Sequence, residues 1–173
     1  MDLDRCVGCG GLFPKMEGPT HLYMESSPGC WAIYGEVLAR EYSNVAFSQT
    51  HRVTVDAYAA QHPGHPSPQS IQSVAGHLIR LCLLLEYGLE IERANAAMLK
   101  AIESKKKFAW LTPPPSRGAL TVLDVHRASS VEYNVQRVSA WAASVWAAWA
   151  PHHDQIRQWL PVEFDSRKRR PGK

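Results

Sequence analysis

The sequence contains no uninterrupted apolar run that approaches the length of a membrane span, so we expect no transmembrane helix and no membrane partner. It begins Met-Asp-Leu-Asp-Arg without the apolar stretch of a secretory signal, which favours the cytoplasm. Phosphate-loop, nucleophile-elbow and dinucleotide-binding patterns are absent, as are internal repeats. The sequence therefore contains no complete catalytic motif.

Positive and negative charges nearly balance outside the C-terminus. The formal net charge of +3 depends on five basic residues within 167–173, and without them 14 basic residues face 16 acidic ones. We expect residues 166–173 to form a basic, disordered tail. The first thirty residues contain only Arg5 and Lys15 as cations, too few for a surface that follows phosphates. This argues against nucleic acid as a partner.

Cysteine is also rare, with four in 173 residues, yet three of the four lie near the N-terminus. Cys6 and Cys9 form a C-x-x-C turn followed by two glycines, and Cys30 follows a Pro-Gly turn. Thiolates in such turns are typical ligands of structural zinc, which takes four ligands in a closed tetrahedron. We therefore expect one zinc ion to organise residues 1–30, which have little else to pack.

The fourth zinc ligand is less clearly marked. His21 lies between the two turns and is the best candidate, with Glu25, His51 or another distant histidine as alternatives. A disulfide from Cys30 to one of the other two cysteines is the competing interpretation, but a reducing compartment favours the metal. The remaining cysteine, Cys82, lies in an apolar run and is expected to be a small buried hydrophobe.

Apolar residues recur at helical spacing through most of the chain. This predicts a mainly α-helical bundle with an N-terminal zinc-bound loop segment, in a single domain over residues 1–165. Ser67-Pro68, a capping serine before proline, opens the clearest and most central helix. Residues 43–52 are expected to form a loop and 121–125 a short extended piece. Helices are expected over 30–42, 53–62, from Pro68 towards Gly88, over 89–105, and over 128–160 with a kink or break at Pro151.

Several of these motifs resemble a bacterial family of unknown function, in a likeness that spans about residues 6–160. The residues that carry it are Cys6-x-x-Cys9-Gly10, His21, Cys30-Trp31, Val55-Asp56-x-Tyr58-x-x-Gln61-His62-Pro63-Gly64 and His77-Leu78. The resemblance implies a shared pattern and no established activity. More weakly, the chain resembles DinB-like helical bundles, some of which bind a metal through three histidines. That likeness implies metal-binding roles for His77 and for His152 or His153.

Polar residues gather just before the most apolar helix, whose edge carries His77. Asp56, Tyr58, His62 and His77 are therefore candidates to line one pocket, where His152 or His153 could join them. Two or three imidazoles with a carboxylate, Asp56 or Glu86, would hold a catalytic metal. The simpler interpretation is that each histidine caps a helix or makes one private hydrogen bond.

Two classes of function follow from these patterns. The first is a zinc-stabilised module that binds a protein or small-molecule partner. The second is a metal- or histidine-dependent enzyme that acts on a small molecule through the pocket around Asp56, His62 and His77. We favour the module, because no catalytic constellation is complete in the sequence.

Overall fold

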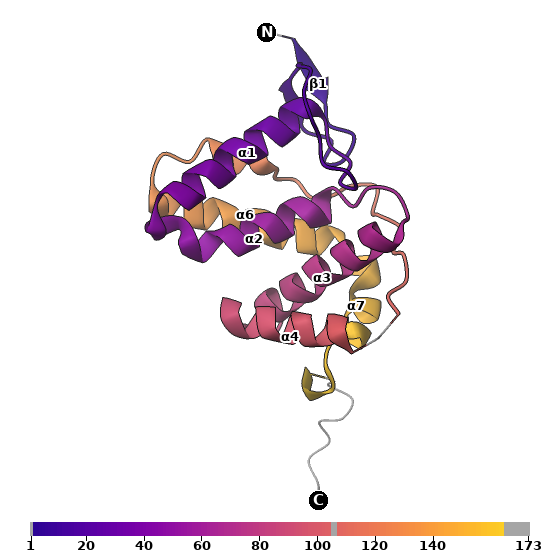
Figure 1. Cartoon of the computed structure of the whole chain (residues 1–173). Coiled ribbons are helices and arrows are strands. Elements are labelled where there is room, and N and C mark those ends of the chain that lie inside the picture. The colour runs from indigo at the N-terminus through magenta and orange to yellow at the C-terminus, as the bar shows by residue number, and fades with distance from the viewer. Residues whose placement is uncertain (1, 105–106, 165–173) are drawn as a thin grey trace, which may run out of the picture.

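The computed structural model of the chain describes residues 2–104 and 107–164, so the predicted basic tail lies outside the described residues. Within them the chain is mainly helical, which confirms the predicted fold class (Figure 1). None of the described helices is long and apolar enough to cross a membrane. The α-helices are α1 (Pro28–Ser43), α2 (Ser48–Gln61), α3 (Pro68–Leu85), α4 (Ile91–Glu103), α5 (Val122–His126), α6 (Val131–Ala148) and α7 (His153–Trp159).

A short β-hairpin precedes the helices and lies at one end of the molecule (Figure 1). Strand β1 (Leu3–Arg5) pairs antiparallel with β2 (Leu12–Pro14), and the turn between them carries the C-x-x-C motif. Phe13 of β2 is fully buried in the hydrophobic core, which anchors the hairpin to the helices. The N-terminal segment that the sequence predicts as a loop thus contains a hairpin.

Serine followed by proline marks the start of two helices. Ser67 caps α3 by accepting a hydrogen bond from the Ser70 N–H at 3.1 Å, as predicted. Ser27 caps α1 in the same way, with a hydrogen bond from the Cys30 N–H at 3.3 Å. Proline suits the position after the cap because it lacks the N–H that a first helical turn leaves unsatisfied. The cap of α1 fixes Cys30 in the first turn of the helix.

Residues 122–125 belong to α5, which Thr121 caps, and do not form the extended piece that the sequence suggests. Thr121 and Asp124 form a capping box, in which the Asp124 carboxylate accepts a hydrogen bond from the Thr121 N–H at 2.8 Å. Val122 and Val125 are both buried, at the spacing of one helical face. A segment of five residues is too short for its hydrophobic pattern to distinguish a helix from a strand.

Helix α2 begins at Ser48, inside residues 43–52, where the sequence predicts a loop. The buried positions of its first two turns are polar: Thr54 donates a hydrogen bond to Glu41 at 2.6 Å, and His51 lies 3.2 Å from the same carboxylate. Burial raises the pKa of Glu41, and the hydrogen bonds from Thr54 and His51 partly oppose this shift. Because Thr50 and Thr54 are the residues that these turns bury, hydrophobic periodicity does not reveal the first turns of the helix.

Helix α2 contacts both α6 and α3, and so lies at the centre of the fold (Figure 1). Two fully buried tryptophans, Trp141 in α6 and Trp149 directly after it, fix the C-terminal end of α2. The Trp141 indole N–H donates to Gln61 Oε1, and the Trp149 indole N–H donates to the Ala60 carbonyl, each at 3.0 Å. Gln61 also donates to the Leu120 carbonyl at 2.7 Å, which ties the connector before α5 to the same point.

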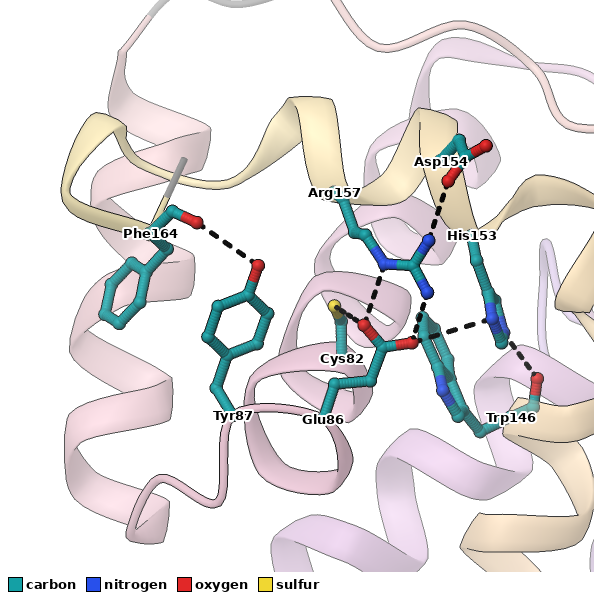
Figure 2. A network of polar contacts seen from close by, with 8 residues as sticks. All are labelled: Cys82, Glu86, Tyr87, Trp146, His153, Asp154, Arg157 and Phe164. Carbon is teal, nitrogen blue, oxygen red and sulfur yellow. Dashed lines mark hydrogen bonds and ion pairs between the residues drawn. The ribbon is translucent and has the colours of Figure 1, made fainter. Parts of the chain in front are cut away.

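A network around Glu86 joins the end of α3 to α7 (Figure 2). Arg157 donates two hydrogen bonds to the Glu86 carboxylate, each at 2.8 Å, and these lower the pKa of Glu86. The His153 ring stacks on Trp146 with ring centroids 3.9 Å apart. Pro151 lies between α6 and α7, which confirms the break predicted there.

Candidate metal centre

Three segments that are distant in the sequence bring four ligand side chains together. Cys6 and Cys9 come from the hairpin turn, Cys30 from the first turn of α1, and His62 from the residue that ends α2. Cys30 Sγ lies 4.0 Å from Cys9 Sγ and 3.5 Å from His62 Nε2, and Cys6 Sγ lies 3.6 Å from the same nitrogen. The four ligand atoms all lie within 4.8 Å of one another, and all four residues are buried. This set, the Cys3His group, could bind a metal ion.

His21, the fourth ligand favoured by the sequence, lies outside the Cys3His group, and His62 occupies that place. The Nδ1 atom of His21 accepts a hydrogen bond from the Tyr23 N–H at 3.4 Å, and its ring packs against Tyr23 and Trp31. His62 and Cys30 are 32 residues apart, so ligand spacing does not identify His62. His62 is one of the distant histidines that the sequence leaves as alternatives, and it lies at a helix end before a Pro-Gly turn.

Contacts from α1 and α2 orient the ligand side chains. His62 Nδ1 lies 2.7 Å from the Tyr58 carbonyl oxygen; because only a protonated nitrogen donates to a carbonyl, Nε2 presents its lone pair to the thiols. The Tyr58 hydroxyl lies 3.6 Å from Cys30 Sγ, and its ring stacks on the imidazole with centroids 4.0 Å apart. The Ser27 N–H donates to Cys6 Sγ at 3.4 Å. Such outer contacts fix the ligands of a protein metal site.

Three thiols packed this closely do not ionise independently. Hydrogen bonds from Cys30 and Cys9 hold the pKa of Cys6 far below its usual value. The hydrogen bond with Cys30 lowers the pKa of Cys9, but the one with Cys6 and burial outweigh it and raise that pKa to about 12. Hydrogen bonds with Cys6 and Cys9, together with burial, raise the pKa of Cys30. The chain alone thus favours one thiolate, and three thiolates in this space require a cation.

Glycine at position 8 lets the hairpin turn approach the His62 ring. A Cβ atom there would lie 2.3 Å from Cδ2 of His62 and 2.2 Å from the Glu25 carbonyl oxygen. Arg117 donates a hydrogen bond to the Gly8 carbonyl at 3.0 Å and to the Gln61 carbonyl at 3.2 Å. Burial lowers the pKa of Arg117, while Glu25 and the thiols of the group act in the opposite direction. The Arg117 guanidinium therefore adds a positive charge beside the turn.

Replacing Gly8 with alanine is expected to disturb the Cys3His group, because the new methyl group must displace either the imidazole or the backbone. We expect a loss of about 1–3 kcal/mol in the free energy of unfolding, the usual cost of overpacking, measured by urea denaturation. Gly35→Ala is the matched control, since a Cβ at Gly35 in α1 meets no atom within 4 Å. It should stabilise the helix by about 0.5–1 kcal/mol. Equal stability of the two variants would contradict the close approach.

The four residues expected to line one pocket divide between two places. Tyr58 and His62 belong to the Cys3His group and its surroundings, whereas Asp56 is buried on another face of α2 and does not cap it. His77 Nδ1 lies 2.7 Å from Asp56 Oδ1, and Arg80 donates from Nε to Asp56 Oδ2 at 2.7 Å and from Nη2 to Oδ1. Residues 58 and 62 share a face because they are one helical turn apart.

The other candidate residues each contact a different part of the chain. These contacts are His152 with the Thr112 carbonyl, His153 with Trp146 and Glu86, His51 with Glu41, and Glu25 with His65. Across residues 2–104 and 107–164, the Cys3His group is the one set of three or more His, Cys, Asp and Glu side chains close enough to hold a metal ion. Within these residues, His77, His152 and His153, which the DinB-like resemblance implies as metal ligands, do not form such a set.

Comparison with known proteins identifies the family. The sequence model of a family described as "Family of unknown function (DUF5946)" matches residues 4–150, and the chain belongs to this family. The match includes the whole Cys3His group and the Asp56–His77–Arg80 network, and it confirms the resemblance to a family of unknown function. No curated protein and no solved structure matches the chain.

Proposed function

We propose that the Cys3His group binds one zinc ion. The observation that supports this is the spacing of its ligand atoms. Zinc bonds of about 2.3 Å to sulfur and about 2.0 Å to nitrogen require, in a tetrahedron, about 3.8 Å between sulfurs and about 3.5 Å between sulfur and nitrogen. The Cys9–Cys30 sulfur separation of 4.0 Å and the sulfur–nitrogen separations of 3.6 and 3.5 Å are close to these values. Thiolates with one imidazole are also a ligand set that zinc prefers over magnesium or calcium.

The zinc ion in this proposal is structural. Four protein side chains complete the tetrahedron, and a catalytic zinc keeps a position open for water or substrate. His62 and Cys30 are fully buried, so these two ligands are closed to solvent. The ion would join the hairpin turn, the start of α1 and the end of α2, and so fasten the N-terminal segment to the helices. Reduced thiols in such a site suit a reducing compartment, which supports the cytoplasm.

The chain in this proposal is a zinc-stabilised module that binds a protein or small-molecule partner through its helical part. The zinc site would then set the shape of the module without taking part in recognition. Residues 1–165 would form one domain with the zinc-bound segment. The scarcity of cations among the first thirty residues argues against nucleic acid as the partner.

Two single substitutions test this site. The purified wild-type chain should hold one zinc ion, measured by native mass spectrometry and elemental analysis. Replacing an outer contact of a zinc site weakens binding by about 10–100-fold, and loss of a ligand should cost at least as much. His62→Ala should therefore lose zinc readily to a chelator. His21→Ala is the matched control and should keep its zinc. Retention of zinc by His62→Ala, or its loss from His21→Ala, would contradict the ligand set.

A further inference from the structure

A second site lies between α3 and α4, away from the Cys3His group. The cavity there has a volume of about 410 Å³, within the range of about 300–1,000 Å³ that is usual for small-molecule sites. Gln69, Gln72 and Ser73 line it from the first turns of α3, and Met98 and Ile102 line it from α4. Polar groups thus occupy one side and apolar groups the other, as in sites that hold a small organic molecule.

His77 supplies an available acceptor to this cavity. Its Nδ1 lies 2.7 Å from the carboxylate of Asp56, which is fully buried and accepts hydrogen bonds from Arg80, so Nδ1 is the nitrogen that donates. In the neutral imidazole Nε2 is then an acceptor, and among residues 2–104 and 107–164 no hydrogen bond reaches it. The His77 side chain is 17% exposed and lines the cavity. The Asp56 contact also fixes the orientation of the ring, which is the arrangement of a prepared binding group.

The charge at this site is compensated. Arg80 is the one residue with a full charge among the described residues that line the cavity. Its Nε and Nη2 donate to Asp56 and its Nη1 donates to Asn95 Oδ1 at 2.8 Å, so each guanidinium nitrogen already has a partner. An anionic ligand would have to compete with Asp56 for Arg80, and a cationic ligand would meet the guanidinium. The cavity therefore suits an uncharged molecule.

Gly76 keeps the apolar side of the cavity open. Glycine inside a helix is less stable than alanine, because its backbone loses more conformational freedom on folding, and Gly76 is buried in the middle of α3. A Cβ there would lie 3.3 Å from Ile102 Cδ1 and 3.6 Å from Met98 Sδ. A larger side chain would extend into the space that these two residues line. Gly76 therefore lowers the stability of α3 but keeps the cavity open.

We propose that this cavity binds a small uncharged organic molecule with an apolar body and a hydroxyl group, which donates a hydrogen bond to Nε2 of His77. Met98, Ile102 and Gly76 contact the apolar body. Gln69, Gln72 and Ser73 bind further polar atoms of larger ligands. The inference goes beyond the zinc site, because none of these residues belongs to the Cys3His group. Tyr23 of the N-terminal segment also lines the cavity, so binding is tested on zinc-loaded protein and zinc content is measured separately.

The test uses the zinc-loaded full chain with four probes of similar size: phenol, toluene, benzoate and benzylamine. Binding is measured by NMR, from the shifts of the amides that line the cavity and of the His77 side-chain nitrogens. Phenol should bind, shift the His77 Nε2 resonance, and bind about tenfold more tightly than toluene, as expected for one hydrogen bond. Benzoate and benzylamine should bind more weakly than phenol. Equal binding of phenol and toluene, stronger binding of a charged probe, or no shift at the cavity would overturn the proposal.

Two variants connect the result to the site. His77→Asn keeps an N–H that can reach Asp56 but removes Nε2, so it should fold, hold zinc and lose the preference for phenol over toluene. Gly76→Leu fills the apolar side and should abolish binding of both probes. If Gly76→Leu does not fold, Gly76→Val provides the smaller change. Undiminished phenol binding in folded His77→Asn would overturn the role of His77.

Discussion

Replacing Cys9 with serine is expected to remove the zinc ion and to release the N-terminal segment from the helices. Structural zinc contributes about 10–16 kcal/mol of apparent binding free energy in zinc-finger peptides, where it is the main source of stability. The helices of this chain also bury an apolar core, in which Trp141 and Trp149 are fully buried, so part of the fold should survive. We expect a loss of at least about 3 kcal/mol, or about 10 °C in melting temperature. Hydrogen exchange should rise most in residues 3–14, and a chelator should give wild type the same pattern.

Cys82→Ser is the control for this experiment. Cys82 is fully buried in α3 and lies outside the Cys3His group, and burial raises the pKa of its thiol to about 12. It is thus an inert core residue, whose replacement should cost stability without loss of zinc. Full zinc content and unchanged melting in Cys9→Ser would contradict the structural role of the ion. Equal zinc loss in both variants would show that general destabilisation, and not the missing ligand, releases the metal.

Three of the four residues of the Cys3His group could be found in the sequence because local turns present them. Cys6 and Cys9 share one turn, and the cap at Ser27 places Cys30 in the first turn of α1. His62 could not be found in this way, because its position depends on how the end of α2 packs against α1. Hydrophobic periodicity and ligand spacing contain no information about that contact.

Helix α3 was predictable because its start signal and its apolar face agree, whereas the start of α2 was not. The first turns of α2 carry Thr50 and His51, which both contact the Glu41 carboxylate. Each of these polar groups finds its partner only in the folded chain, so the sequence shows a polar segment where the structure has the start of a central helix. Polar residues buried with partners are the exception to hydrophobic patterning.

The block from Asp56 to His62 serves three parts of the fold from a single helix. Tyr58 and His62, one turn apart, face the cysteines, while Gln61 binds Trp141. Asp56 points to α3, where it fixes Arg80 and His77. One helix therefore links the Cys3His group, the core and the proposed cavity. The sequence predicts one pocket for Asp56, Tyr58 and His62, whereas the structure places Asp56 in a different site from the other two.

Replacing Arg80 with methionine is expected to be the most destabilising change in the helical part of the chain. The substitution leaves the fully buried Asp56 carboxylate with His77 as its remaining side-chain partner. Removing one member of a buried ion pair typically costs about 3–5 kcal/mol, because the other charge stays buried without compensation. Urea denaturation of the zinc-loaded protein measures this loss. Arg52→Met is the matched control, since exposed Arg52 reaches the same Asn95 only at 3.5 Å.

A double replacement separates the buried charge from the loss of packing. In Arg80→Met with Asp56→Leu, no carboxylate remains unpaired, and apolar replacements of a buried ion pair are often neutral or stabilising. We therefore expect the double variant to recover at least half of the stability that Arg80→Met loses. A double variant as unstable as the sum of the two single variants would show that the ion pair contributes no coupling. Zinc content should remain at one ion per chain throughout, because neither Asp56 nor Arg80 lies in the Cys3His group.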